Sequence, residues 1–136
     1  MAEISIHNIP ELGKPAGHYC HVARVRNASE RLYIAGMVAN DASGNLVAED
    51  DFEAQALQVF RNIEQALRSN GASWRNVVQF TTYLTRADDV KHWRSFRSRE
   101  FAKWFPDAKY PPNTLLIIDR LATEQYLLEV QTIAEL

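Results

Sequence analysis

Two stretches of the chain repeat their apolar positions with the spacing of an α-helix. The first is residues 50–70, which opens with acidic residues and is followed by Gly71, as a helix C-cap would be. The second is residues 87–104, and Pro106 lies just beyond its end. Its apolar side consists of Val90, Trp93, Phe96, Phe101 and Trp104. This spacing predicts two amphipathic helices, each burying one side in a core.

The rest of the chain has the alternation and the β-branched residues that are typical of strands. We expect five strands, over residues 19–26, 31–37, 77–85, 113–119 and 125–134. In 77–85 the even positions from Val78 to Leu84 are suited to packing on helices, while the odd positions point the other way. The order of strands, helix, strand, helix, strands is that of an α+β domain. The sequence therefore predicts one mixed sheet with both helices on one face.

The last two predicted strands carry apolar residues on both faces. Leu127 and Ile133 share a row with Glu129, and both rows of 113–119 hold large aliphatic residues. Strands that are apolar on both faces are normally covered on both. Because two helices cover one face, we expect another copy of the chain to cover the second. Glu129 and Asn113 would then lie in or beside an interface between subunits.

Composition and charge narrow the class of protein. With 136 residues, 46% hydrophobic and 24% charged, the chain fits a single globular domain over residues 1–136. A formal net charge of -2 gives no general attraction for nucleic acid. No apolar run approaches the roughly 20 residues of a membrane span. Cys20 is the single cysteine, and the N-terminus lacks the order of a secretory signal, so we expect a cytoplasmic protein without a membrane partner.

A short histidine-rich stretch could suggest a metal site. It reads His18-Tyr19-Cys20-His21. On a strand, however, His18 and Cys20 point one way and His21 points the other. A shared metal would also need a third ligand, and the remaining histidines lie in unrelated segments. We therefore expect ordinary hydrogen-bonded histidines and no metal.

The second predicted helix is basic enough to raise the question of RNA binding. Residues 86–103 hold six basic against three acidic residues, with tryptophans nearby. A solvated helix face, whose bases extend over an aromatic stripe, explains the same pattern. We favour that explanation and expect no nucleic-acid partner.

Glu129 is an acidic residue in an apolar row. A lone glutamate on a strand usually faces solvent, whereas Leu127 and Ile133 in its row favour burial here. A carboxyl surrounded by apolar side chains can exchange protons near neutral pH. From the pattern alone, Glu129 is either a solvent-facing residue or an acid/base catalyst, and both interpretations stay open.

Several segments taken together resemble the RidA/YjgF family of small Rid proteins. They are Tyr19, LYIAGMV at 32–38, the helix with Glu53-Ala54-Gln55-Ala56 and Asn62-Ile63, and PPNTLLIIDRL followed by LLEVQTIA near the C-terminus. Each motif is degenerate, but they cover nearly the whole chain in the family's order. The resemblance implies a chorismate-mutase-like α+β fold, assembled as a homotrimer with three pockets between subunits. It also implies the hydrolysis of reactive enamines and imines derived from amino acids, with release of ammonia.

The resemblance assigns roles to individual residues. The family's glutamate on the last strand, which positions or activates water, falls on Glu129. The tyrosine that lines the pocket falls on Tyr19. The Ser or Thr beside the substrate carboxylate falls on Thr114. A further aromatic residue, Trp104, is expected to help wall the pocket.

Two positions depart from the family's pattern. The arginine that grips the substrate carboxylate is Asn113 here, and the serine that often precedes the glycine of the third-strand motif is Ala35, beside Gly36. Arginine supplies a permanent charge and a bidentate fork, whereas asparagine offers a neutral amide. Asn113 can hold a carbonyl or a carboxamide, so we expect the usual 2-imino acid to bind poorly to this divergent chain.

The leading hypothesis is a cofactor-free hydrolase or deaminase that acts on a small enamine- or imine-type metabolite at a pocket between subunits. In this hypothesis Glu129 relays protons, and Asn113 and Thr114 orient the substrate. The alternative is a non-catalytic trimer that binds a small ligand. A third hypothesis, RNA binding or cleavage through the basic helix, rests on charge alone.

Overall fold

The computed structural model describes residues 1–136 and contains six strands and two helices. In chain order they are β1 (Glu3–His7), β2 (Val22–Arg26), β3 (Arg31–Met37), α1 (Phe52–Ser69), β4 (Val77–Leu84), α2 (Val90–Trp104), β5 (Asn113–Ile117) and β6 (Leu128–Glu135). Short 3-10 turns occupy Pro10–Leu12, Trp74–Asn76 and Ala87–Asp89. Both predicted helices and all five predicted strands are confirmed, with ends shifted by a few residues. Strand β1 was not predicted.

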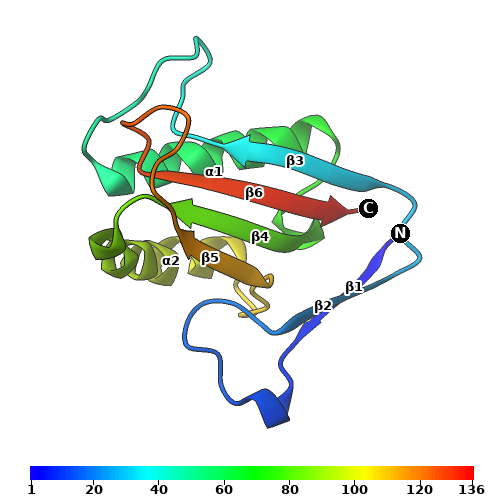
Figure 1. Ribbon diagram of the computed structural model, residues 1–136. Helices are drawn as coiled ribbons and strands as arrows, with labels where there is room; N and C mark the ends of the chain where they lie inside the picture. The colour runs from blue at the N-terminus through cyan, green and yellow to red at the C-terminus, as the bar shows by residue number, and fades with distance from the viewer.

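The main sheet has four strands in the order β3-β6-β4-β5. Only β4 and β5 run parallel, so the sheet is mixed, as predicted. Figure 1 shows α1 and α2 together on one face of this sheet. The expectation of a single sheet is wrong for residues 19–26, because β2 pairs with β1 in a separate two-stranded sheet. The partner strand of β2 is β1, whose sequence Glu-Ile-Ser-Ile-His alternates polar and apolar residues as a strand does.

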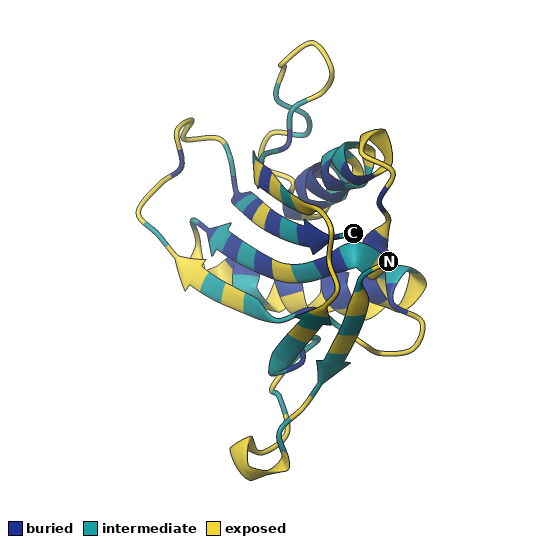
Figure 2. Ribbon diagram, turned by 90° about the vertical axis from the view of Figure 1, so that its right-hand side faces the viewer, coloured by how far each residue is buried: buried dark blue, intermediate teal, exposed yellow.

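Strand β6 alternates between the two faces as its sequence predicts. One row lies against the helices and is fully buried, and it consists of Leu128, Val130, Thr132 and Ala134. The alternate residues Glu129, Gln131 and Ile133 are half-buried or exposed on the other face. Figure 2 shows the resulting bands of burial along the strands of the main sheet.

Strand β4 follows its predicted pattern from Phe80 to Leu84 but not at its beginning. The register with β6 shifts between Val77 and Gln79, which is the signature of a β-bulge. The extra residue turns Val77 into the core, where it is fully buried, and leaves Val78 only half-buried. The expectation that Val78 packs on the helices is therefore wrong, because alternation does not continue through a bulge.

An aromatic layer fills the space between the sheet and the two helices. Phe60 of α1 lies with its ring centre 5.9 Å from Trp93 and 5.5 Å from Phe96 of α2. Phe80 of β4 completes the contact at 5.8 Å. Burying each of these side chains contributes about 1.5–3 kcal/mol. The layer fixes the rotation of α2 on the sheet and thus decides which other α2 side chains point inward.

The opposite face of the main sheet is uncovered within one chain. Tyr33 of β3 is 72% exposed and Leu116 of β5 is 39% exposed. Glu129 and Tyr83 are paired across β6 and β4 and share this face. Neither helix is long and apolar enough to cross a membrane.

Candidate functional site

Glu129 lies on the uncovered face, directly over Gly36. The pairing of β3 with β6 slips between Ile34 and Met37, so a bulge includes Ala35 and Gly36. A Cβ atom at position 36 would lie 2.2 Å from Glu129 Oε1 and 2.8 Å from its Cδ. Glycine at this position therefore makes room for the carboxylate. We call Glu129 and Gly36 the acid half-site.

Asn113 lies on the other face of the sheet, beneath α2. The hydroxyl of Thr82, which is fully buried in β4, donates a hydrogen bond of 2.7 Å to Asn113 Oδ1. This bond leaves the two amide N–H donors of Asn113 available to a hollow of about 270 Å³. The hollow is lined by Ala16, Gly17, Tyr19, Arg94, Arg97, Asn113 and Leu115.

The loop before β2 forms one wall of this hollow. The backbone N–H of Cys20 donates to the carbonyl of Tyr110 at 3.0 Å, and that of Tyr19 donates to Gly17 at 3.0 Å. The ring of His18 packs edge-on against Tyr110, with centres 5.2 Å apart. These contacts place Tyr19 in the wall of the hollow that Asn113 also lines.

Arg97 of α2 forms the floor of the hollow and is the most unusual group there. It is only 4% exposed, and its guanidinium lies 5.0 Å above the ring of Trp93. Its Nη1 donates to the carbonyl of His18 at 3.3 Å, while its Nε has no partner. Its Nη2 lies 3.0 Å from the place a Cβ would take at Gly17. A buried guanidinium is thus held in a space left by a glycine.

Two pKa shifts follow from this burial. Burial first, and the neighbouring charge of Arg94 second, lower the pKa of Arg97 to about 10, and Tyr19 opposes the shift. The pKa of His18 is lowered by burial and, to a smaller extent, by the charge of Arg97. Arg97 therefore stays charged at neutral pH while His18 favours its neutral form. We call Tyr19, Arg94, Arg97 and Asn113 the cation half-site.

The two half-sites do not meet within one chain. Glu129 pairs with Tyr83 and Asn113 pairs with Phe80, so they are two strands and three residues apart, or about 14 Å between Cα atoms. They also point to opposite faces. Thr114 follows Asn113 directly and points to the face of Glu129.

Trp104 lies in neither half-site. Its ring stacks on Trp74 at 4.7 Å and on Phe60 at 5.1 Å, inside the aromatic layer. The structure therefore places this predicted pocket residue among core side chains, where its apolar spacing on α2 would also put it.

Sequence reasoning did not single out Arg94 or Arg97, because both were counted as part of a solvated basic face. A signal for Arg97 was present. It lies four residues after Trp93 and four before Phe101, which places it on the apolar side of α2. An arginine on that side is either buried or extends past the core, and here it is buried.

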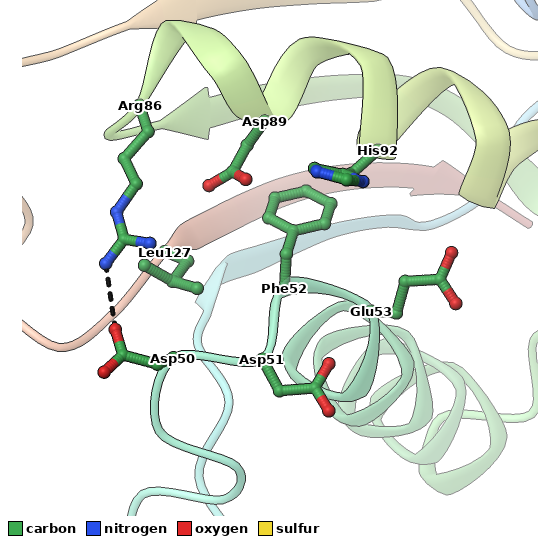
Figure 3. A pocket seen from close by; sticks show the side chains of 8 residues that line it. All are labelled: Asp50, Asp51, Phe52, Glu53, Arg86, Asp89, His92 and Leu127. Carbon is green, nitrogen blue, oxygen red and sulfur yellow. Dashed lines mark hydrogen bonds and ion pairs between the residues drawn. The ribbon is translucent and has the colours of Figure 1, made fainter.

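A larger hollow of about 490 Å³ lies between the starts of the two helices (Figure 3). Its lining is mainly acidic, with Asp50, Asp51, Glu53 and Asp89 against the basic residues Arg86 and His92. Asp51 caps α1 by accepting from the backbone N–H of Ala54 at 3.0 Å, and Arg86 pairs with Asp50 at 3.0 Å. Acidic residues at helix N-termini are stabilising in themselves. None of the predicted site residues lines this hollow.

The histidine-rich stretch forms ordinary contacts. His21 Nδ1 accepts a hydrogen bond from the backbone N–H of Ile9 at 3.0 Å. Cys20 is buried, and its Sγ lies 3.9 Å from the carbonyl of Ala108. No group of three or more His, Cys, Asp or Glu side chains is arranged to hold a metal ion.

Comparisons with known proteins extend over nearly the whole chain. The sequence model of the family described as Endoribonuclease L-PSP matches residues 10–136. A RutC family protein of Pyrococcus horikoshii is 28% identical over 121 residues, which cover 89% of each chain. The crystal structure of YyfB from Yersinia pestis, described as a protein of unknown function of the conserved Rid family, is 26% identical and superposes with a TM-score of 0.85 over 98% of both chains.

A second solved structure shares the same arrangement. RidA from the Antarctic bacterium Psychrobacter sp. is 26% identical, with a TM-score of 0.66 over 90% of this chain and 92% of that one. These matches confirm the family resemblance and the α+β fold with its mixed sheet and two helices.

Proposed function

Because the chain belongs to the Rid/YjgF/RutC family, we propose that it is a cofactor-free hydrolase that deaminates a small enamine- or imine-type metabolite at a pocket shared between copies of the chain. The observation that carries this proposal is the division of the site. The acid half-site and the cation half-site lie on opposite faces of one sheet, about 14 Å apart. A small substrate can touch both only where two copies meet.

The assembly in this proposal is the homotrimer that the family resemblance implies. A closed ring of three copies would present each acid half-site to a neighbour's cation half-site and would create three pockets. It would also cover the face that carries Tyr33 and Leu116, which are exposed in the single chain. Burial of such apolar surface supplies a driving force for association.

Hydrolysis of an imine adds water across the C=N bond. The water oxygen bonds to the imine carbon while the Glu129 carboxylate accepts a water proton. That proton then passes to the nitrogen, which gives a carbinolamine. Glu129 next transfers the hydroxyl proton of the carbinolamine to the nitrogen, so that the C–N bond breaks as the carbonyl forms and ammonia leaves. One water is consumed, and Glu129 returns to its starting form. An enamine enters the same route after tautomerising to the imine, by gaining a proton at carbon and losing one from nitrogen.

The local structure supports Glu129 in this role. Its carboxylate is half-buried and lies over the bulge at Gly36, where no Cβ blocks the approach of a small molecule. A side chain held over backbone in this way has few alternative rotamers, and a fixed acid/base group is more effective than a mobile one.

The test is ammonia release from imines generated in solution from amino acids. We expect Glu129→Gln to lower the rate by about 10²–10⁴-fold, the usual contribution of a general acid/base. Glu124→Gln is the matched control, because Glu124 is an exposed acid paired with Arg120 at 2.9 Å. Equal rates for wild type and Glu129→Gln would refute the role. A substrate that binds but is recovered unchanged would favour a binding protein instead.

Mixed assemblies test whether the site is shared. Glu129→Gln chains and Asn113→Ala chains should each release ammonia more slowly than the wild type when expressed alone. Coexpression of the two should restore activity in roughly a quarter of pockets, where an intact Glu129 meets a neighbour's intact Asn113. No recovery in assemblies shown by mass to contain both chains would place the whole site within one subunit.

A further inference from the structure

We propose that Arg97, assisted by Arg94, supplies from α2 the positive charge that Asn113 cannot supply from β5, and that the substrate of this chain therefore carries a carboxylate. This inference rests on the proposed function, because it names the class of substrate for the same shared pocket. It reverses the expectation that a 2-imino acid binds poorly: the anchor has moved from a strand to a helix.

The burial and hydrogen bonding of Arg97 favour the binding of an anion. Arg97 is only 4% exposed, and it takes part in no ion pair within the chain. One of its five donors reaches the carbonyl of His18, and its Nε has no partner. A buried, unpaired charge is strongly unfavourable. An anionic ligand in the hollow would offset that penalty.

The other bases of α2 show that this arrangement is particular to one part of the helix. Arg99 pairs with Glu53 at 2.8 Å, and Lys103 pairs with Glu100 at 3.0 Å. Arg94 and Arg97 lack such partners. The charge of Arg94 also contributes, after burial, to the lowered pKa of Arg97. Within one chain, two guanidiniums thus line one hollow that no acidic residue lines.

The remaining polar groups of the hollow are donors as well. Asn113 has its oxygen engaged by Thr82, so its N–H groups are left for a ligand, and Tyr19 contributes a hydroxyl. None of the residues that line the hollow is acidic. At about 270 Å³ the space suits a molecule of a few heavy atoms. A planar carboxylate fits this set of donors, because a guanidinium can bind both of its oxygens.

Calorimetry with unreactive probes tests the inference directly. Pyruvate carries a carboxylate, and pyruvamide has the same shape without the charge. We expect wild type to bind pyruvate at least tenfold more tightly than pyruvamide, and Arg97→Met to abolish that difference. Arg94→Met, at an exposed position, should reduce it in part, and Arg97→Lys should retain part of it because the charge remains.

The control variant is Arg99→Met, which removes one positive charge from the same helix outside the hollow. It should leave pyruvate affinity unchanged. Pyruvate affinity that is equal in wild type, Arg94→Met and Arg97→Met would overturn the inference. Inorganic phosphate that binds more tightly than pyruvate and depends on Arg97 would overturn the assignment to a carboxylate.

Failure of this inference can be told apart from failure of the proposed function. Pyruvate binding that depends on Arg97, without any acceleration of ammonia release, would uphold the anion site and remove the hydrolase. Ammonia release that depends on Glu129 but is equally fast for neutral imines, and insensitive to Arg97→Met, would uphold the hydrolase and remove the anion site.

Discussion

Replacing Arg97 by methionine is expected to stabilise the ligand-free protein while it destroys ligand binding. Methionine keeps an unbranched apolar stem over Trp93 but removes the buried charge. Burial lowers the pKa of Arg97 from the ordinary value of a guanidinium to about 10, and at about 1.36 kcal/mol for each pKa unit the folded state disfavours the charged form by about 3 kcal/mol.

Two favourable contacts disappear in the same variant. The cation–π contact with Trp93, at 5.0 Å, contributes about 1 kcal/mol, and the hydrogen bond to the carbonyl of His18, at 3.3 Å, contributes about 1 kcal/mol. The expected net effect of Arg97→Met is therefore a gain of about 1 kcal/mol in the free energy of unfolding. For a domain of this size the gain corresponds to a rise of roughly 4 °C in Tm.

The gain should depend on pH in a defined direction. Arg97 has a lower pKa when folded than when unfolded, so the unfolded chain binds more protons from about pH 10 up to the ordinary pKa of a guanidinium. The free-energy cost of burying the charged Arg97 therefore destabilises the wild type fully below pH 10, and this cost disappears as the pH rises above 10. The advantage of Arg97→Met should accordingly be constant from pH 7 to 9 and begin to shrink near pH 10.

Urea denaturation followed by circular dichroism, at one fixed protein concentration and without added anions, measures the effect. Arg99→Met is the control, and the loss of its exposed pair with Glu53 should lower stability by at most about 1 kcal/mol. A loss of 2 kcal/mol or more in Arg97→Met would refute the reasoning, since it would mean that the guanidinium stabilises the folded chain and needs no ligand.

Three further changes examine the two half-sites. Gly36→Ala places a methyl group 2.2 Å from Glu129 Oε1, so the carboxylate must move. Ammonia release should fall about 100-fold while the circular dichroism spectrum is retained. An unchanged rate would show that the position of the carboxylate is unimportant. Asn113→Ala leaves the buried hydroxyl of Thr82 without its acceptor, so urea denaturation should reveal a loss of about 1–3 kcal/mol in the free energy of unfolding, and no loss would mean that the hydroxyl finds another acceptor. The lowered pKa of His18 means that the unfolded chain binds this proton more readily, so stability should decline as the pH falls below about 6.5. Titration of the ring by NMR checks the last prediction, and a pKa of His18 at or above its ordinary value would contradict it.

Much of the fold could be predicted because its elements are amphipathic. The rows of β6 and the aromatic side of α2 each follow from a single period, 2 or about 3.6 residues, and burial confirms both. The β-bulges could not be predicted from these periods. Nothing in the letters around Val77 marks the extra residue, because a bulge arises from the pairing of two strands and not from the residues of one.

The candidate site was harder to predict from the sequence than the fold, for a related reason. The face of Glu129 on β6 was predicted correctly. Both rows of 113–119 are apolar, however, so only the pairing with β4 places Asn113 on the opposite face and two strands away. The burial of Arg97 depends on Gly17, which lies far away in the chain and leaves space for the guanidinium. The sequence alone identifies a charged residue, whereas the tertiary structure determines whether its side chain lies in solvent or in a pocket.

The separate sheet of β1 and β2 has a consequence for how the pocket opens. The loop of residues 8–21 between these strands carries Ala16, Gly17 and Tyr19, which form one wall of the cation half-site. A two-stranded sheet is marginally stable by itself, so this wall can separate at a lower free energy than the four-stranded sheet. A ligand that bridges Tyr19 and Arg97 should draw the wall against α2. Ligand binding and ordering of β1 and β2 would then be coupled, and the amide protons of these strands should exchange more slowly when the pocket is filled.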